Sequence, residues 1–379
     1  MKSFLNGSID QLNEKFNLVL ISSQGKELTE LHEKYGVRTL EVPMERHMSI
    51  AKDIKSLWQM IKVFYAEKPY IVHSMTPKAG LICMIAALIA RVPRRVHTFT
   101  GLVWPTAVGH KRKILMLTDK ILCACATHII PEGEGVKNDL QTHITKMPMR
   151  VLGFGNVRGV DMDFWKVTPL IKDQSEELRG KFLGNSIRGS KKCFNFIFVG
   201  RLVGDKGINE LIVAFLKLHD YYLNLHSNQA IRLILVGSPE DSLDPLKQIT
   251  WDRIKSTPSI IEVGPVWGND ILKYYSASDC LVMPSYREGF PNTVLEAGAM
   301  GLPSIVTDIN GSREIIENGK NGFIVPSKDI NALYKAMKRM MEDKDTYKIM
   351  ASNARPMVES RFEQSFVRKC LFDFYDEIM

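Results

Sequence analysis

Short apolar runs alternate with stretches of helical periodicity along almost the whole chain. This pattern is typical of parallel β-sheets covered by helices on both faces, because strands buried on both faces consist mainly of apolar residues. In the first half, strands are predicted at 17–22, 70–75, 94–99 and 127–130. A helix is predicted between the first two of these strands, and one face of it carries Ile50, Ile54, Leu57, Trp58, Ile61 and Tyr65.

A polar stretch, about 156–192, is expected to be a connector with one short helix. The alternation then resumes, and strands are predicted at 194–199, 231–236, 260–263, 280–283, 304–306 and 322–325, with helices between them. Two doubly wound α/β domains in tandem are the simplest account, over 1–165 and 166–359, with a C-terminal helix at 360–379 that packs back on the first. Ligands of such folds bind at the carboxyl ends of the strands, and the cleft between two domains is the default site.

The length of 379 residues suits two or three domains. The longest uncharged apolar run, 79–90, has twelve residues where a membrane span needs about 20, so it predicts a buried helix. The N-terminal residues lack the apolar core of a signal peptide. The six cysteines include no Cys-x-x-Cys pair. We therefore expect a cytoplasmic protein in a reducing compartment, without a bound metal.

The formal net charge of +8 is unevenly distributed, since residues 51–150 hold 15 Lys and Arg against 6 Asp and Glu. Such a basic segment suits an anionic partner, which could be nucleic acid, a membrane surface or a phosphorylated substrate. A solvated basic face that keeps the protein soluble explains the surplus equally well.

The segment from Gly200 to Gly207 follows a predicted strand and precedes a predicted helix. Its glycines let the backbone approach a ligand, the helix start offers free N–H groups, and Arg201 and Lys206 add positive charge. These features favour a phosphate site. The segment matches neither the dinucleotide fingerprint nor the P-loop, so a glycine-rich turn with two exposed cations is the alternative.

A second segment, 286–303, predicts a helix from Pro291 to Met300, with Glu288 in the loop before it and Glu296 inside it. Even if the whole stretch were helical, the two carboxylates would be about 12 Å apart, farther than the pair of a glycosidase. Two separate roles in accepting hydrogen bonds from hydroxyls fit better, and ordinary surface carboxylates are the alternative.

Two histidines fall on predicted strands of the first domain. His97, near the end of its strand, is expected to face the cleft between the domains, where it could bond or orient a ligand. A structural role is the alternative for His97, and equally for His73.

These motifs resemble those of the retaining glycosyltransferases of family 4, whose GT-B fold consists of two facing Rossmann-like domains with a cleft between them. The resemblance is specific over about 194–345 and looser in the first half. It rests on the motifs at 200–207, 264–266, 288–296, 311–314 and 321–323, and in the first half on those at 73–80, 97–101 and 134–137.

The resemblance implies that the second domain binds a nucleotide-sugar donor, most simply a UDP-sugar, and that the first binds the acceptor. Arg201 and Lys206 would neutralise the donor's diphosphate and stabilise it as it leaves. Glu296 would hold the ribose hydroxyls and Glu288 those of the transferred sugar. The remaining predicted contacts are the backbone N–H groups at Gly289 and Phe290 with the distal phosphate, the backbone at Val266 with the base, and His97 with the sugar or the acceptor.

Members of this family typically need no metal, so neither a metal nor another cofactor is expected. The implied acceptor is a saccharide or a polyprenyl-diphosphate-linked unit of a surface polysaccharide such as a capsule. The basic half, including the segment 110–113, would contact the acceptor's diphosphate or the anionic inner face of the membrane, and no nucleic acid is expected as a partner.

The chain departs from the family at its start, because family members begin with a central strand and a glycine-bearing loop. Residues 1–7 already look like the end of that loop and the start of the first helix. The expectation is that the first strand is missing, so that the strands at 17–22 and 70–75 have unpaired backbone groups. The start would then lie some 15 to 20 residues too late.

Three alternatives remain open. A nucleotide-sugar epimerase would share the two-domain layout but lacks the paired Glu motif. A nucleic-acid-binding protein would use the basic half and would leave the motifs of the second half unexplained. A dinucleotide oxidoreductase needs an acidic residue about 20 positions after its glycine motif, whereas this loop offers cations.

Overall fold

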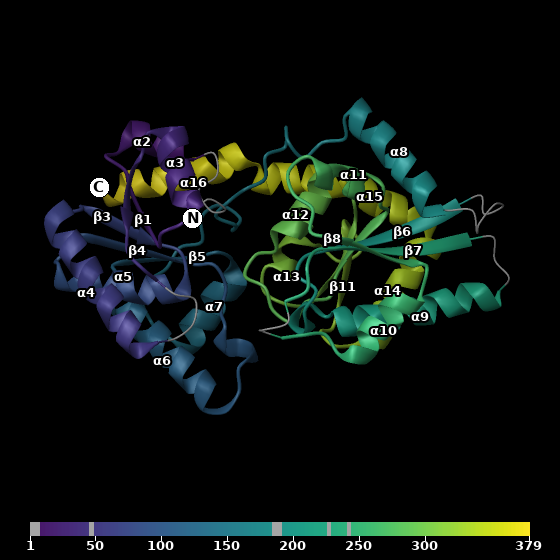
Figure 1. The fold of residues 1–379 in the computed structure, drawn as a ribbon, viewed down its shortest axis with the longest axis horizontal. Helices are drawn as coiled ribbons and strands as arrows, with labels where there is room; N and C mark the ends of the chain where they lie inside the picture. Colours follow the sequence, from purple (N-terminus) through teal and green to yellow (C-terminus); the bar gives the residue numbers. More distant parts are fainter. Residues whose placement is uncertain (1–7, 45–48, 184–191, 226–228, 241–243) are drawn as a thin grey trace. The chain divides into compact units, whose positions relative to one another are not determined.

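The computed structural model describes residues 8–44, 49–183, 192–225, 229–240 and 244–379. The chain forms two compact units, one of residues up to Gly159 together with Gln364–Met379, the other of Val160–Glu363 (Figure 1). Both are layered α/β units with parallel strands, as the sequence predicted. Residues 1–7, on which the expectation of a truncated start rests, lie outside the described residues, as do 184–191 of the connector.

The second unit is built on one sheet of six parallel strands, in the order β11-β10-β9-β6-β7-β8. The order reverses between β6 and β9, which are neighbours although β7 and β8 lie between them in sequence. All six strands stand where apolar runs predicted them: β6 Lys192–Val199, β7 Gln229–Val236, β8 Ile260–Gly264, β9 Cys280–Met283, β10 Ser304–Thr307 and β11 Gly322–Val325.

Helices cover both faces of this sheet (Figure 1). On one face lie α9 Ile208–Asn224, α10 Gln248–Ser256 and α14 Ile330–Glu342. On the other lie α8 Pro169–Leu183, α11 Asp270–Ser276, α12 Asn292–Ala299 and α15 Lys344–Phe362. The short helix α13 Ser312–Ile315 follows β10. The central strand is fully buried, with Phe196, Ile197 and Phe198 all 0% exposed, which explains its unbroken apolar sequence.

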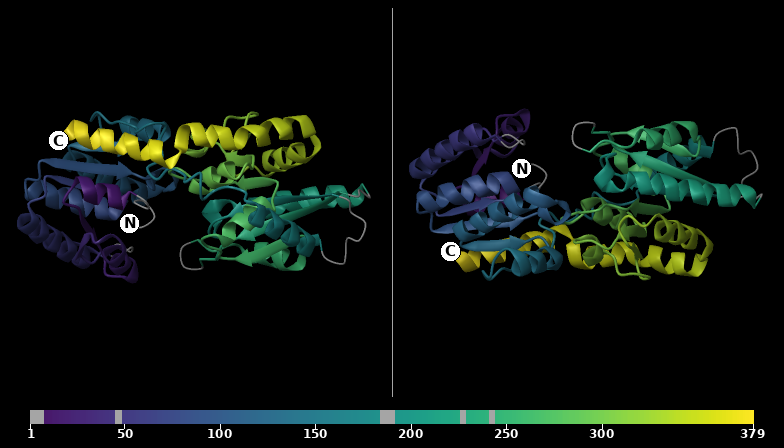
Figure 2. Two further views of the ribbon diagram at one scale, coloured as in Figure 1. Left: turned by 90° about the horizontal axis from the view of Figure 1, so that it is seen from above. Right: turned by 90° about the horizontal axis from the view of Figure 1, so that it is seen from below.

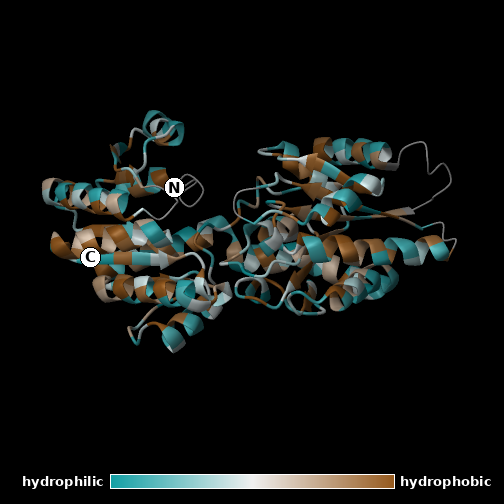
Figure 3. Cartoon of the chain, turned by 60° about the horizontal axis from the view of Figure 1, so that its bottom comes forward, coloured by the Kyte–Doolittle hydropathy of each residue, from teal (hydrophilic) through white to brown (hydrophobic). Residues whose placement is uncertain are grey.

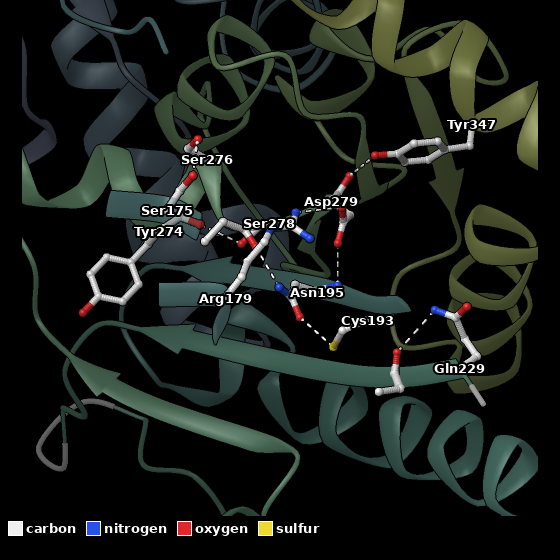
Figure 4. Close-up of polar contacts among 12 residues, drawn as sticks. Ser175, Arg179, Cys193, Asn195, Gln229, Tyr274, Ser276, Ser278, Asp279 and Tyr347 are labelled. Carbon is white, nitrogen blue, oxygen red and sulfur yellow. Dashed lines mark hydrogen bonds and ion pairs between the residues drawn. The ribbon is translucent and has the colours of Figure 1, made fainter. Parts of the chain in front are cut away.

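A network of polar side chains connects β6, β9 and α8 at the amino ends of the strands (Figure 4). One carboxylate oxygen of Asp279 accepts from the backbone N–H of Asn195 at 2.7 Å, and the other accepts from Arg179 of α8 at 2.8 Å. The Asn195 side chain donates to the carbonyl of Ala277 at 2.8 Å. These bonds fasten the connector helix to the sheet, and they leave the opposite edge of the sheet for binding.

The first unit contains two parallel sheets. One pairs β1 Val19–Ser22 with β2 Arg38–Glu41, and the other has the order β3-β4-β5, with β3 Ile71–Ser74, β4 Arg94–Phe99 and β5 His128–Pro131. Among the described strands, β1 pairs only with β2 and β3 only with β4. The sequence did not reveal β2, since four residues with two charges form no apolar run.

Helices cover both faces of the three-stranded sheet (Figure 1). Val72, Phe99 and Ile129 face the layer of α4 Ile50–Glu67, α5 Pro77–Ile89 and α6 Gly109–Cys125. Val96 and Ile130 face the opposite layer of α2 Ile9–Lys15, α3 Lys26–Tyr35 and α16 Gln364–Ile378. The helix α7 Glu134–His143 follows β5, and a short 3-10 turn, η1 Trp104–Thr106, precedes α6.

The C-terminal helix α16 belongs to the first unit, although α15 before it belongs to the second (Figure 2). Tyr70 donates to the carbonyl of Met379 at 3.0 Å, and Arg94 donates to the carbonyl of Ile378 at 2.5 Å. The units divide at 159/160 and 363/364, where the sequence suggested 165/166 and 359/360. The difference arises because Met162, Trp165 and Phe362 lie in the hydrophobic core of the second unit.

Two helices of the first unit expose apolar side chains. On α4 most of the predicted apolar face is exposed, with Ile50 at 82% and Trp58 at 62%, whereas Ile61 of that face is buried together with Met60 and Phe64. The helix predicted as buried at 79–90 exposes Leu88 and Ile89 at its end. No described helix combines the length and apolar character needed to cross a membrane. All six cysteines are free thiols.

The buried histidines predict acid sensitivity. Burial lowers the pKa of His73 to about 4 and, with a smaller contribution from His73, that of His97 to about 3. In the unfolded chain these histidines have a pKa near 6.5, so as the pH falls they take up protons there before they do in the folded protein. Their contribution to the free energy of unfolding is therefore fully present above pH 6.5 and is lost as the pH drops toward 4 and 3. We expect the free energy of unfolding to fall by about 1.4 kcal/mol per pH unit for each histidine in this window.

Urea unfolding measured between pH 7 and pH 4.5 checks this slope, and His73→Gln should reduce it. His110→Gln, at an exposed position, is the control. An equal slope in the unaltered protein and His73→Gln would contradict the role of burial.

Candidate functional site

The two predicted motifs of the second unit meet at the switch point of the sheet. The segment 200–207 follows β6 and the segment 284–291 follows β9, and these strands are neighbours. Loops at the carboxyl ends of neighbouring parallel strands lie on the same edge, where ligands of such folds bind. Here the Nζ of Lys206 lies 2.5 Å from Oε1 of Glu288, with the two side chains only 15% and 13% exposed. The predicted phosphate cation and the predicted hydroxyl acceptor therefore form one ion pair.

Two glycines allow these loops to approach one another. Gly207 has φ +71°, and a Cβ there would lie 2.1 Å from the carbonyl oxygen of Pro284. Gly311, in the loop after β10, has φ +75°, and its Cβ would lie 2.1 Å from the carbonyl oxygen of Gly289. Only glycine adopts these conformations without strain and leaves room for the neighbouring backbone. Three loops are thus packed backbone to backbone around Glu288.

Further contacts that sequence reasoning missed join the first two loops. Arg287 donates to Asp205 at 3.0 Å, and the backbone N–H of Tyr286 donates to the carbonyl of Asp205 at 2.8 Å. The Tyr286 hydroxyl donates to Glu210 of α9 at 2.6 Å. About 80 residues separate these partners in sequence, so no local pattern could have identified them.

Arg201 lies at the same edge but pairs with a third loop. Its guanidinium, half exposed, forms an ion pair with Glu240 in the loop after β7. In that loop Asp244 accepts a hydrogen bond from the backbone N–H of Asp205 at 2.6 Å. Both predicted phosphate cations therefore have carboxylate partners.

Glu296 lies on α12, which runs from Asn292 to Ala299 with Pro291 at its N-cap, one residue inside the predicted bounds at each end. Its carboxylate accepts a hydrogen bond from Tyr275 at 3.3 Å. Burial, and secondarily the Glu296 charge, raises the pKa of Tyr275, so this hydroxyl stays protonated and acts as a donor. A second acceptor of hydroxyl groups is thus fixed at the same edge of the sheet.

The backbone positions predicted to bind the donor lie in the same set of loops. Gly289 and Phe290 form the turn between β9 and α12, where Phe290 packs on Phe362 with ring centroids 5.3 Å apart. Val266 follows β8 and is half-buried. Next to it Trp267 is 81% exposed, a bare aromatic face that the sequence analysis did not single out.

The sequence predicted that His97 could contact a ligand, but the structure buries its ring. Its ring lies between β4 and α5, 1% exposed, with Nδ1 2.8 Å from the Ser74 hydroxyl, and Gly80 leaves it room. Its Nε2 has no hydrogen-bond partner among the described residues. His73 is structural, since the hydroxyls of Tyr375 and Thr98 occupy both of its nitrogens, at 2.6 and 2.7 Å.

The second unit therefore presents cations, carboxylates and backbone amides together at one sheet edge. Cations and amides bind phosphate oxygens, and carboxylates bind hydroxyls, so the arrangement suits a ligand with phosphate next to a polyol. In the part of the chain that the structure describes, no cluster of three His, Cys, Asp or Glu side chains could hold a metal ion.

Comparison with known proteins extends over both units. The family described as "Glycosyl transferases group 1" matches residues 186–357, and the one described as "Glycosyl transferase 4-like" matches residues 3–132.

Two relatives match nearly the whole chain. It is 32% identical over 382 residues to the capsular polysaccharide biosynthesis glycosyltransferase CapM of Staphylococcus aureus, a match that covers 99% of this chain and 94% of CapM. It is 32% identical over 355 residues to the Escherichia coli UDP-Gal:alpha-D-GlcNAc-diphosphoundecaprenol alpha-1,3-galactosyltransferase, covering 92% of this chain and 86% of that enzyme.

Among solved structures, Anabaena Alr3699/HepE in complex with UDP-glucose superposes with a TM-score of 0.77 at 18% identity and covers 98% of this chain and 94% of that one. Sucrose-phosphate synthase from Thermosynechococcus elongatus gives a TM-score of 0.76 at 17% identity, covering 98% and 92%. These likenesses show the fold, which is GT-B.

The close approach of Gly207 to Pro284 predicts a specific loss of stability. In Gly207→Ala the new Cβ must displace backbone, whereas Gly319→Ala has a similar φ of +84° and no atom within 4 Å. Both variants carry the strain of a positive φ, so the difference between their free energies of unfolding measures the clash of the new Cβ with the backbone of Pro284. We expect Gly207→Ala to be less stable than Gly319→Ala by about 1 to 3 kcal/mol in urea unfolding. Equal stabilities would show that the two loops are not held in contact.

Proposed function

Because the chain belongs to the group 1 glycosyltransferases, we propose that it transfers a sugar, with retention of configuration, from a UDP-sugar to a lipid-linked acceptor during synthesis of a surface polysaccharide. The observation that carries the proposal is the contact between Lys206 and Glu288 at the switch point of the second sheet. A nucleotide sugar carries phosphate directly beside sugar hydroxyls, and this pair places a cation directly beside a carboxylate.

In this proposal Lys206 and Arg201 bind the donor's diphosphate and stabilise the charge that develops on it as the bond to the sugar breaks. Each cation exchanges a carboxylate partner for phosphate oxygens, since Lys206 leaves Glu288 and Arg201 leaves Glu240. The exchange frees Glu288 to accept hydrogen bonds from the hydroxyls of the transferred sugar. The binding site is therefore already charged and oriented before the donor arrives.

The remaining donor contacts follow from the positions of the loops. Glu296, held by Tyr275, accepts from the ribose hydroxyls. Backbone amides at Gly289 and Phe290 bind the distal phosphate, and the backbone at Val266 meets the base. The contact of His97 with the sugar or the acceptor is not part of this proposal, because its ring is 1% exposed.

The names of the relatives support the finer parts of the proposal. That of CapM places it in capsular polysaccharide biosynthesis, and that of the Escherichia coli enzyme names a UDP-sugar donor and a diphosphoundecaprenol-linked acceptor. Anabaena Alr3699/HepE was solved with UDP and with UDP-glucose. By analogy this chain would act in the cytoplasm at the inner face of the membrane, with its first unit binding the acceptor.

We further propose that no metal takes part, because two cations already lie where a metal would neutralise the diphosphate. Family membership favours transfer over epimerisation. It also accounts for the paired motifs of the second unit, which a nucleic-acid-binding protein or a dinucleotide oxidoreductase leaves unexplained.

Loss of either partner in the central ion pair should slow transfer. A charge-assisted hydrogen bond contributes about 1.5 to 3 kcal/mol, so Lys206→Ala and Glu288→Gln should each lower kcat/KM by about tenfold to a hundredfold. The assay measures UDP release and product from UDP-sugars in the presence of EDTA. The control is Glu317→Gln, which removes a similar but exposed pair with Lys320 at 2.9 Å. Unchanged rates in both site variants would refute the donor site, and loss of all activity in EDTA would refute metal independence.

The stereochemical proposal has its own measurement. With an α-linked UDP-sugar as donor, NMR of the product should show an α-glycosidic linkage. A β-linked product would overturn retention while leaving the donor site intact.

A further inference from the structure

The outer surface of the α4–α5–α6 layer carries apolar side chains that the fold does not bury. On α4 the exposed positions are Ile50, Ile54, Trp58 and Tyr65, spaced by four, four and seven residues, so they form one stripe along the helix. The buried side of α4, formed by Met60, Ile61 and Phe64, adjoins this stripe, since Ile61 is three residues from Trp58 and four from Tyr65. The helix therefore has a core face and, beside it, a second apolar stripe in contact with solvent.

This stripe turns toward α5, because the hydroxyl of Tyr65 donates to the carbonyl of Ile89 at 3.2 Å. The helix α5 packs between α4 and α6 and has a single charged residue, Lys78, near its start. It is apolar on its outer side too, where Leu88 and Ile89 are exposed. A helix that is apolar all round is normally covered on all sides.

On α6, at the other side of α5, a matching stripe of Ile114, Leu117 and Ile121 is exposed. These residues are spaced by three and four, so they too share one side of their helix. We call the exposed apolar residues of the three helices the outer apolar band. Figure 3 colours the chain by hydropathy and shows helices that carry both hydrophobic and hydrophilic positions.

Basic residues outnumber acidic ones on the three helices that carry the outer apolar band. The three helices contain eight Lys and Arg and three Asp and Glu. The three acids are paired or buried: Asp53 pairs with Lys78 of α5 at 2.6 Å, Glu67 pairs with Arg38 at 2.7 Å, and Asp119 is 9% exposed.

By contrast, the exposed side chains of Lys55, Lys62, Lys111, Lys113 and Lys120 form no ion pair with any residue that the structure describes. On α4 the positions of Lys55 and Lys62 fall about 40° to 140° around the helix from the apolar stripe, so cations border it. The surface thus combines an apolar centre with a basic rim.

We propose that the outer apolar band with its basic rim is the surface by which this protein docks on an anionic lipid bilayer. The inference rests on the proposed function, since a lipid-linked acceptor brings the enzyme to a membrane. Apolar side chains enter the boundary between headgroups and acyl chains, Trp58 and Tyr65 suit that boundary, and the lysines meet lipid phosphates. A second copy of the chain fits less well, because two like-charged rims would repel each other.

Flotation of the full chain with lipid vesicles tests the proposal. We expect binding to phosphatidylcholine vesicles that contain about a third phosphatidylglycerol, weak binding to pure phosphatidylcholine, and loss of binding as salt rises from about 0.05 to about 0.5 M. Lys55→Glu with Lys62→Glu should weaken binding at least about tenfold, since each cation near an anionic surface contributes about fivefold.

The apolar part of the surface has a matched control. Ile54→Glu with Trp58→Glu should abolish flotation, whereas Ile349→Glu should not, because Ile349 on α15 is as exposed as Ile54, 54% against 52%, but lies in the other unit. Circular dichroism checks that all variants fold. Flotation of the Ile54/Trp58 variant equal to that of the unaltered protein overturns the proposal. A second outcome also overturns it: light scattering shows an oligomer of the unaltered protein, and the Ile54/Trp58 variant is monomeric but floats equally well. That result would assign the surface to contact with a second copy of the chain.

Transfer to a short-chain, water-soluble acceptor separates this inference from the proposed function. We expect the Ile54/Trp58 variant to keep its rate in that lipid-free assay and to lose rate only with acceptor embedded in vesicles. Equal rates with the embedded acceptor overturn the docking surface and leave the donor site untouched. A chain that transfers no sugar but still binds vesicles through this surface refutes the proposed function instead.

Discussion

The neighbouring position of β6 and β9 is the constraint on which the organisation of the second unit depends. These strands pair through Phe196 with Cys280 and Ile197 with Leu281, and everything at their ends follows from this pairing. At their amino ends Asn195 and Asp279 form a closed structural network, and at their carboxyl ends Lys206 meets Glu288. Because parallel strands run in the same direction, one pairing produces a fastened edge at their amino ends and, at their carboxyl ends, the edge proposed to bind the donor, called here the binding edge.

The binding edge is charged but internally compensated. Lys206, Arg201 and Arg287 each contact a carboxylate that comes from a different loop. Partly buried cations are costly without a partner, so these ion pairs stabilise the loops. In the proposed function, a diphosphate offers the same cations stronger and more numerous oxygens than these carboxylates do.

The first unit has polar groups buried in its core and apolar side chains exposed on its surface. His73 and His97 lie on opposite faces of one sheet, His73 satisfied by two hydroxyls and His97 with one nitrogen unpartnered. Outside the sheet, the α4–α5–α6 layer buries one set of apolar residues and leaves another exposed beside lysines. That excess of apolar surface is the reason for assigning this unit a role at a membrane.

The sequence by itself determined the class of fold, the positions of ten strands and the two charged motifs, because buried parallel strands require unbroken apolar runs and loops at their ends require glycine. It missed β2, which is too short and charged to form such a run. Only the tertiary structure decided that Lys206 contacts Glu288, that Arg287 contacts Asp205 and that Glu240 pairs with Arg201, since strand order joins residues that no local spacing relates. It likewise decided which side of α4 is buried, because periodicity identifies an apolar stripe but not the neighbour that covers it.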